Sequence, residues 1–327
     1  MAKKLRIGFV GAGGISHVHM TRLAGVKQAE VVALTDPDKK AIERFHGAFP
    51  ASAALPVYKD YRAMIEHEAL DATVILSPHT LHYEQIHTSI DCGLHVLTEK
   101  PMVSSIREAK ELIAFAKKKN RVLMIAYQRH FEPTFRYMRE QIAKGALGDV
   151  QYVQAVLSQE YLRLVQGTWR LKKALSGGGQ INDSGSHVVD IMMWVTGLKV
   201  KKVFAVMDNF KTEVDINSAL TMEFENGAMG NLAIIGNAPG WYEDHTIVGS
   251  KGAFYLRQGV GLIQQDALGR PVKVRLPKVT KDPSSNFVDS ILGKASPEVP
   301  PECGLRTIEV TEAAWQSAAS GKPVRVP

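Results

Sequence analysis

Short apolar runs recur along the first part of the chain and are separated by amphipathic stretches. The runs cover residues 5–10, 31–35, 72–76, 95–98 and 121–126. Stretches with helical spacing, at 81–92 and 104–119, separate the last three of these runs. Strands that alternate with helices in this way predict a parallel, doubly wound sheet.

The pattern changes after about residue 126. A helix is expected over 133–144, because Pro133 is tolerated in a first turn, and a strand is expected over 151–158. Beyond residue 200 several strands follow. The clearest two, 219–224 and 229–235, flank Asn226-Gly227, a dipeptide typical of a hairpin turn. We therefore predict two domains, 1–126 and 127–327, the second being an α+β domain with a largely antiparallel sheet.

Composition places the chain among ordinary globular proteins. Of its 327 residues, 45% are hydrophobic and 22% are charged. No apolar run approaches 18 residues, so we expect no membrane span. The basic start, Met1-Ala2-Lys3-Lys4, precedes an apolar stretch too short for a signal peptide. Cys92 and Cys303 form no disulfide framework and no zinc spacing, which fits a reducing compartment such as the cytoplasm.

The formal net charge is +7, which raises the question of a nucleic-acid partner. The basic residues are scattered along the chain. Their one tight run, at 117–119, falls where a helix should end, and cations are favourable there. We expect no nucleic-acid partner; an anionic substrate or solubility explains the charge equally well.

A glycine-rich segment directly follows the first apolar run: Gly11-Ala12-Gly13-Gly14-Ile15-Ser16. Its first two glycines match a dinucleotide fingerprint, in which they permit a tight turn and a close approach of the backbone to a pyrophosphate. Ser16 replaces the third glycine with another small residue. A glycine turn without a ligand is the alternative. The preceding strand and the following helix favour the nucleotide site.

Asp36 lies 20 residues after Ser16, at the end of the second apolar run. A carboxylate at that position accepts hydrogen bonds from the adenosine ribose and repels a 2′-phosphate, so it predicts NAD in preference to NADP. Because Pro37 follows, Asp36 also fits the N-cap of a helix that has proline in its first turn.

Asp183 and His187 are four residues apart, just after Gly177-Gly178-Gly179. On a helix this spacing places both side chains on one face, as in a general base whose imidazole is oriented by a carboxylate. An N-cap role for Asp183 and a hydrogen-bonded core role for His187 are alternatives, as is a metal pair. Because no third ligand stands at a telling spacing, we predict no metal.

Further candidates stand at the end of the fourth apolar run and in loops of the second domain. Glu99-Lys100-Pro101 closes that run, and a lysine at the carboxyl end of a parallel strand can stabilise a substrate alkoxide. A solvated lysine at a strand end is the alternative. Trp169-Arg170 and Trp241-Tyr242 would line a sugar pocket or anchor the core.

Together these segments resemble the glucose–fructose oxidoreductase, inositol dehydrogenase and rhizopine-catabolism family (Gfo/Idh/MocA) over nearly the whole chain. The matching residues are Gly11-Ala12-Gly13-Gly14-Ile15 with His19, Ser77-Pro78 with His82, Glu99-Lys100-Pro101, Trp169-Arg170, and Gly177-Gly178-Gly179 followed by Asp183 and His187. The sequence departs from the family at Ser16 and at Gln128-Arg129-His130, where Asn-Arg-Arg is expected.

The resemblance implies a Rossmann domain, an open-faced sheet domain, a nicotinamide cofactor and a site built from Lys100, Asp183 and His187. It implies cofactor contacts at Gly11, Gly13, Gly14, Ile15, Asp36, Ser77, Pro78, His82, Glu99 and Lys100. It places substrate contacts at Lys100, Arg129, Trp169, Arg170, Asp183 and His187. Because an exposed sheet face is usually covered, we also expect a homo-oligomer.

The function expected is hydride transfer between NAD(H) and an alcohol or ketone of a sugar, anhydrosugar or cyclitol. His187 would be the general acid or base, oriented by Asp183, and Lys100 would stabilise the oxyanion. Two alternatives stay open at this point. One is a glycosidase that uses NAD transiently, and the other is a non-catalytic NAD-binding regulatory protein.

Overall fold

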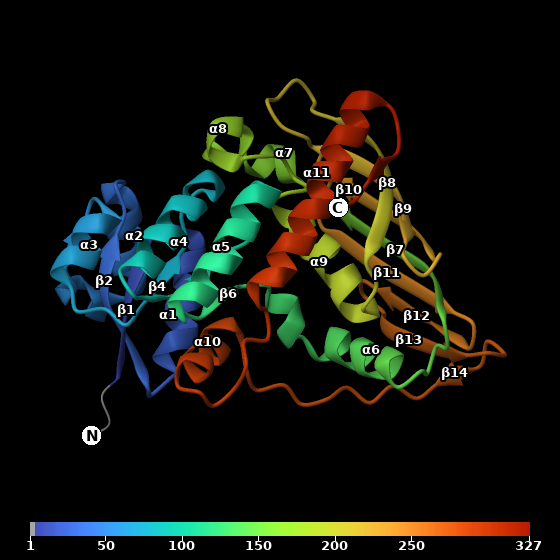
Figure 1. Cartoon of the computed structure of the whole chain (residues 1–327), viewed down its shortest axis with the longest axis horizontal. Coiled ribbons are helices and arrows are strands. Elements are labelled where there is room, and N and C mark those ends of the chain that lie inside the picture. Colours follow the sequence, from blue (N-terminus) through green and yellow to red (C-terminus); the bar gives the residue numbers. More distant parts are fainter. Residues whose placement is uncertain (1–3) are drawn as a thin grey trace. The chain divides into compact units, whose positions relative to one another are not determined.

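The computed structural model describes residues 4–327, which form two compact units (Figure 1). Met1, Ala2 and Lys3, which belong to the basic start considered above, lie outside the described residues. The first unit comprises the chain up to Val103, Arg107–Gln128 and Lys281–Gly304; the second comprises Ser104–Ile106, Arg129–Thr280 and Leu305–Pro327.

This division differs from the expected domains, since the short stretch Ser104–Ile106 belongs to the second unit and a later segment returns to the first. The change of unit after Gln128 lies two residues beyond the expected boundary at 126/127, but residues 281–304, expected in the second domain, belong to the first. The backbone N–H of Ile125 donates to the carbonyl of Val299 at 3.1 Å, which ties this segment to the sixth strand of the first unit. The segment contains the helix Pro283–Ile291. The apolar periodicity of a sequence can indicate a helix, but it does not indicate which sheet that helix packs against.

The first unit is built on a six-stranded parallel sheet of order β3-β2-β1-β4-β5-β6 (Figure 1). The strands are β1 (Leu5–Val10), β2 (Ala29–Thr35), β3 (Val57–Tyr58), β4 (Ala72–Ile75), β5 (His95–Thr98) and β6 (Leu123–Ile125). The predicted doubly wound sheet is confirmed. Strand β3 was not expected, because two residues are too few to give a periodic pattern.

Helices follow the strands of this sheet. They are α1 (Gly14–Ala24), α2 (Lys39–Ala48), α3 (Tyr61–His67), α4 (His82–Asp91), α5 (Ile106–Lys119) and α10 (Pro283–Ile291), with 3₁₀ helices at Pro50–Ala54 and His79–Leu81. The N-cap of α2 is Asp38, whose side chain accepts from the backbone N–H of Lys40. The alternative that made Asp36 the N-cap, with Pro37 in the first turn, is therefore wrong.

The strands of the first unit are apolar on both faces because both faces are covered, which explains the continuous runs in the sequence. Ile7 and Phe9 of β1 and Val74 of β4 are fully buried. Burying side chains of this size stabilises the folded chain by about 1.5–3 kcal/mol each. The carboxyl ends of all six strands lie at one edge of the sheet, where ligands bind in folds of this kind.

The second unit is built on a nine-stranded sheet of order β14-β13-β12-β11-β7-β10-β9-β8-β15 (Figure 1). Its strands are β7 (Val150–Ser158), β8 (Val200–Asp208), β9 (Asn217–Phe224), β10 (Met229–Ile235), β11 (Tyr242–Gly249), β12 (Gly252–Arg257), β13 (Gly261–Asp266), β14 (Pro271–Val272) and β15 (Val324–Arg325). All neighbours are antiparallel except β7 and β10. The expected hairpin at Asn226-Gly227 is confirmed.

Helices lie against one face of this sheet, and their apolar residues share a core with it (Figure 1). They are α6 (Pro133–Ala143), α9 (Ser184–Thr196) and α11 (Pro301–Ser320), with short helices α7 (Tyr161–Leu164) and α8 (Lys173–Ser176) and 3₁₀ turns at Gln128–Phe131 and Trp169–Leu171. The opposite face carries exposed apolar side chains such as Val206 and Met229. Within residues 4–327, no helix is both long enough and apolar enough to cross a membrane.

Candidate active site

The glycine-rich loop joins β1 to α1 and has the geometry of a phosphate cradle. Gly11 has φ +108°, and a Cβ there would lie 2.9 Å from the carbonyl of Leu76. A Cβ built on Gly13 or Gly14 would meet nothing within 4 Å, so open space lies beside the loop. Gly13 is the N-cap of α1, and the first turn holds no acidic residue. The partial positive charge of the helix N-terminus is therefore available to a pyrophosphate.

Ser16 occupies the position of the third glycine in the fingerprint and fits it. Its side chain is fully buried, and its hydroxyl donates to the carbonyl of Gly13 at 2.6 Å. The hydroxyl thus satisfies a backbone acceptor of the loop. Ile15, the preceding residue, is 37% exposed beside the loop.

The Asp36 carboxylate is fixed against the glycine loop. Its Oδ2 accepts from the backbone N–H of Ala12 at 2.8 Å, and its Oδ1 accepts from that of Asp38 at 2.8 Å. Each carboxylate oxygen has a second lone pair, so both can accept a further hydrogen bond. The side chain is held at the carboxyl end of β2 in a defined orientation.

The loops after β4 and β5 are held together by His82. One ring nitrogen, Nδ1, lies 2.8 Å from the carbonyl oxygen of Pro101, and Nε2 lies 2.9 Å from that of Ser77. Burial lowers the pKa of His82, although both carbonyls favour the protonated ring. Ser77 also donates from its hydroxyl to Gln85 at 2.5 Å. His82 therefore positions the segments that contain Ser77-Pro78 and Lys100-Pro101.

Glu99 directly precedes Lys100 and connects the end of β5 to α1. Its Oε1 lies 3.0 Å from Nε2 of His19, whose Nδ1 lies 3.0 Å from the Ser284 hydroxyl. Its Oε2 accepts from the backbone N–H of Lys100 at 3.1 Å. Burial alone would raise the pKa of Glu99, but His19 and Lys100 outweigh it and hold that pKa below its usual range. The backbone of Lys100 is thereby anchored at the same sheet edge as the glycine loop.

In the second unit, Asp183 lies at the end of the segment that leads into α9. Its Oδ2 accepts from Nε of Arg170 at 2.8 Å and from the Tyr161 hydroxyl at 3.1 Å. Asp183 is the N-cap residue of α9, but its side chain makes no capping hydrogen bond. Burial and the Asp183 charge raise the pKa of Tyr161, so its hydroxyl remains a donor. The Arg170 guanidinium lies 4.5 Å from the ring centre of Trp169.

His187 lies one turn into α9 and is half-buried, four residues after Asp183 as the spacing predicted. The segment before the helix is fixed by Asp215, which accepts from the backbone N–H groups of Gly179 and Ile181 at 3.0 and 2.9 Å. A Cβ on Gly179 would overlap the backbone of Asp215. This close approach requires glycine there.

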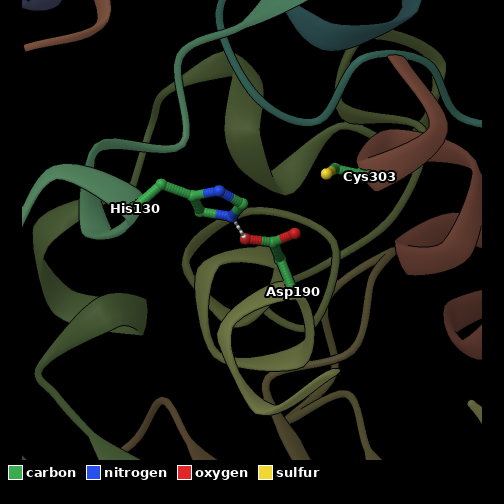
Figure 2. A group of neighbouring side chains, drawn as sticks. All are labelled: His130, Asp190 and Cys303. Atoms are coloured by element: carbon green, nitrogen blue, oxygen red, sulfur yellow. Dashed lines mark hydrogen bonds and ion pairs between the residues drawn. The ribbon is translucent and has the colours of Figure 1, made fainter. Parts of the chain in front are cut away.

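The segment Gln128-Arg129-His130 has a partner for each side chain. The Gln128 amide oxygen accepts from Arg22 at 3.2 Å in the first unit. In the second unit Arg129 forms two contacts of 2.6 Å with Glu243. Nε2 of His130 lies 2.6 Å from Oδ2 of Asp190. Figure 2 draws this contact as a dashed line. Cys303, drawn in the same figure, belongs to the first unit.

Two family models match the chain. Residues 5–127 match the oxidoreductase family with an NAD-binding Rossmann fold, and residues 135–255 match the GFO/IDH/MocA C-terminal domain. The chain belongs to the GFO/IDH/MocA oxidoreductase family. The family resemblance, the fold class and the NAD-binding nature of the first unit are thereby confirmed.

Named relatives of this GFO/IDH/MocA protein include sugar and cyclitol dehydrogenases. A levoglucosan dehydrogenase of Pseudarthrobacter phenanthrenivorans is 25% identical, with 73% of this chain and 69% of the relative covered. A myo-inositol 2-dehydrogenase of Thermotoga maritima is 24% identical, with 77% and 75% covered. The WlbA dehydrogenase from Bordetella pertussis, solved with NADH and UDP-GlcNAcA, superposes with a TM-score of 0.86 at 23% identity over 100% of this chain and 99% of that one.

Within each unit the fold brings predicted residues of this GFO/IDH/MocA protein together. In the first unit the glycine loop and Asp36 are in contact, and Glu99-Lys100 is anchored to His19. In the second unit Arg170 joins Trp169 to Asp183. Sequence reasoning missed Tyr161 and Glu243. Neither lies in a motif, so only the position of Tyr161 just after β7 could have drawn attention to it.

Proposed function

We propose that this protein is a dehydrogenase that transfers a hydride between NAD(H) and a secondary alcohol or ketone of a sugar, anhydrosugar or cyclitol. The single observation that carries the proposal is the Asp183 carboxylate, which is only 4% exposed and is fixed by Arg170 one helical turn before His187. A rigid carboxylate beside an imidazole suits proton transfer to and from a hydroxyl group. The names of the relatives favour a polyhydroxylated substrate.

The proposed roles follow from the chemistry of each side chain. His187 takes the hydroxyl proton during oxidation and returns it during reduction. Asp183 favours the protonated imidazole through its negative charge. Lys100 donates to the oxyanion that develops on the substrate oxygen. NAD, when bound, supplies the nicotinamide ring that accepts or returns the hydride.

Trp169, Arg170 and Arg129 are proposed to contribute to substrate binding. The indole ring of Trp169 offers an apolar face, as sugar sites commonly do. Arg170 lies over that ring and donates a hydrogen bond to Asp183, so it would fix the position of the ring relative to the carboxylate. Ser77, Pro78 and His82 are proposed to shape the nicotinamide side of the cofactor site through the backbone that His82 holds.

The proposal extends to assembly and location. The outward face of the nine-stranded sheet carries the cross-strand row Val206, Ala219, Ala233 and Val156. Uncovered apolar surface of this kind favours association, so we propose a homo-oligomer that buries this face. Cys92 and Cys303 are not joined in a disulfide within residues 4–327, which fits a cytoplasmic enzyme.

A panel of cyclitols, pyranoses and anhydrosugars, each incubated with NAD and the protein, tests the proposal. At least one compound is expected to give saturable net formation of NADH, and His187→Ala prepared in parallel should not. Cleavage of a glycoside without net NADH would instead identify a glycosidase with transient redox. NAD binding without turnover of any compound would favour a regulatory protein.

A further inference from the structure

A cavity of about 650 Å³ opens at the edge of the parallel sheet opposite the glycine loop. His95, at the start of β5, and Leu123, at the start of β6, both line it. Because all six strands are parallel, the starts of these strands lie away from the carboxyl ends where the cofactor loop is found. The volume lies within the range of small-molecule sites.

The protonation of His95 is fixed by its backbone contact. Its Nδ1 accepts from the backbone N–H of Val122 at 2.9 Å, so the neutral ring carries its proton on Nε2. An Nη of Arg121 lies 3.3 Å from that same Nε2. A guanidinium group only donates hydrogen bonds. Two donors therefore face each other, and an acceptor that lies beside both nitrogens, within hydrogen-bond distance of each, would satisfy both.

One polar atom of the Arg121 side chain has no acceptor among the described residues. Its Nε is buried and has no hydrogen-bond partner among residues 4–327. Glu302 lines the cavity, but within the described chain no ion pair joins it to Arg121 or to Lys117, which also lines the cavity. A buried donor that is left without an acceptor destabilises the folded protein. The cavity thus has a positive, donor-rich side.

Apolar side chains form part of the remaining wall, together with polar ones such as Asn120 and Ser290. Ile113 and Ala116 of α5, Leu123 of β6 and Ile291 of α10 line it. We propose that this cavity binds a small organic carboxylate, with its oxygens within hydrogen-bond distance of both His95 Nε2 and Arg121 and its apolar body against Ile113 and Ile291. A carboxylate accepts from both donors at once and forms charge-assisted hydrogen bonds with each. This inference is independent of the proposed dehydrogenase activity.

The charged groups around His95 set the pKa of its imidazole, and a change in that pKa would report ligand binding. Burial and Arg121 lower the pKa of His95, while Asp71 raises it. Lys117 and Glu302 are the other charged groups on the cavity wall. A bound carboxylate favours the imidazolium and raises this pKa toward its ordinary value. The imidazole resonance of His95, assigned by its loss in His95→Gln, reports this change by NMR.

The test titrates the full-length protein with butyrate, and with sulfate as an anion that lacks an apolar body. We expect saturable shifts of the His95 resonance with butyrate, a raised His95 pKa, and weaker binding of sulfate. Arg121→Gln should weaken butyrate binding about 10- to 100-fold, as loss of a charge-assisted hydrogen bond implies. Arg121→Lys keeps the positive charge, so its affinity for butyrate should lie between that of the wild type and that of Arg121→Gln.

Lys118→Gln is the matched control, because Lys118 is an exposed neighbour on α5 that does not line the cavity. It should bind butyrate as the wild type does. The proposal is overturned if His95 shows no saturable shift, if Arg121→Gln binds as tightly as wild type, or if sulfate binds as tightly as butyrate. Preserved resonances of the other histidines would show that each variant is folded.

Discussion

The Asp36 carboxylate accepts a hydrogen bond from the backbone N–H of Ala12 at 2.8 Å, which joins the end of β2 to the glycine loop. The contact places a negative charge beside the loop proposed to hold the pyrophosphate and ribose. The same side chain thus has two separable effects. It anchors the loop, and it sets the charge that a cofactor meets.

Replacing Asp36 with asparagine and with serine is expected to separate these effects. Two like charges about 4 Å apart at an effective dielectric near 20 repel by roughly 4 kcal/mol. Even half of that corresponds to on the order of 30-fold discrimination against NADP. Asp36→Asn removes the charge and keeps an oxygen for Ala12, so it should lose the NAD preference with little loss of stability. Asp36→Ser should also loosen the loop.

Steady-state kinetics with both cofactors, together with thermal unfolding, check this prediction. Equal catalytic efficiency of the wild type with NAD and NADP would contradict it.

Lys100→Met is expected to lower turnover by about 10²-fold or more, because an oxyanion donor acts in the transition state. Methionine keeps the length of the side chain and removes its charge. The backbone contact of Lys100 with Glu99 does not depend on the side chain, so the loop should persist. Steady-state kinetics of the wild type and Lys100→Met give the turnover number and the Michaelis constant together. A raised Michaelis constant with unchanged turnover would make Lys100 a uniform binding group.

Replacing His187 with alanine is expected to lower turnover by about 10²–10⁴, the usual contribution of general acid–base catalysis. His187 lies on α9 in the second unit, so NAD affinity of the first unit should stay nearly unchanged. Fluorescence titration with NADH measures that affinity, and single-turnover kinetics measure the chemical step. A variant that retains near-normal turnover would remove His187 from the mechanism.

Most elements of the first unit could be predicted because each forms a run long enough to show its apolar periodicity, whereas β3, with two residues, could not. The run at 95–98 coincides with β5, and in the second unit α6 is one residue shorter than the helix expected over 133–144. Of the candidate site, only the residues that belong to sequence motifs could be predicted. The partners of those motif residues, such as Tyr161 for Asp183 and Ser284 for His19, are distant or isolated in sequence and carry no pattern. Tertiary packing alone brings them there.

Arg129 and Glu243 give a prediction about acid stability. Burial raises the pKa of Glu243, but His245 and Arg129 outweigh it and the net shift is downward. A lowered folded-state pKa stabilises the protein fully above the unfolded value of about 4.3, and the stabilisation is lost as pH falls through the folded value. Arg129→Met should therefore destabilise the protein near neutral pH, by at most about 3–5 kcal/mol, since it leaves the buried carboxylate with His245 alone.

Denaturant unfolding of both proteins across the acid range measures this difference. The gap between wild type and Arg129→Met should narrow once Glu243 is protonated. A variant with unchanged stability and a raised Michaelis constant would show instead that Arg129 serves substrate binding.

The exposed sheet face of the second unit predicts a variant with altered assembly. Val206 is 61% exposed in the second half of β8. Val206→Glu places a charge in the apolar row and should shift the protein toward smaller species in light scattering. Leu268→Glu, at a 74% exposed position in the turn between β13 and β14, is the matched control and should assemble as wild type does. An unchanged mass for Val206→Glu would exclude this face as the interface.

The return of residues 281–304 to the first unit has a consequence for biosynthesis. His19 acquires its Ser284 partner, and Ile125 its Val299 partner, only after the 152 residues from 129 to 280 have been translated. During translation the nucleotide-binding domain therefore lacks these two contacts, one to α1 and one beside β6, until most of the chain has been made. The stretch 305–327, which completes the second unit, leaves the ribosome directly afterwards. Both units thus reach their final structure at nearly the same moment of synthesis, rather than one after the other.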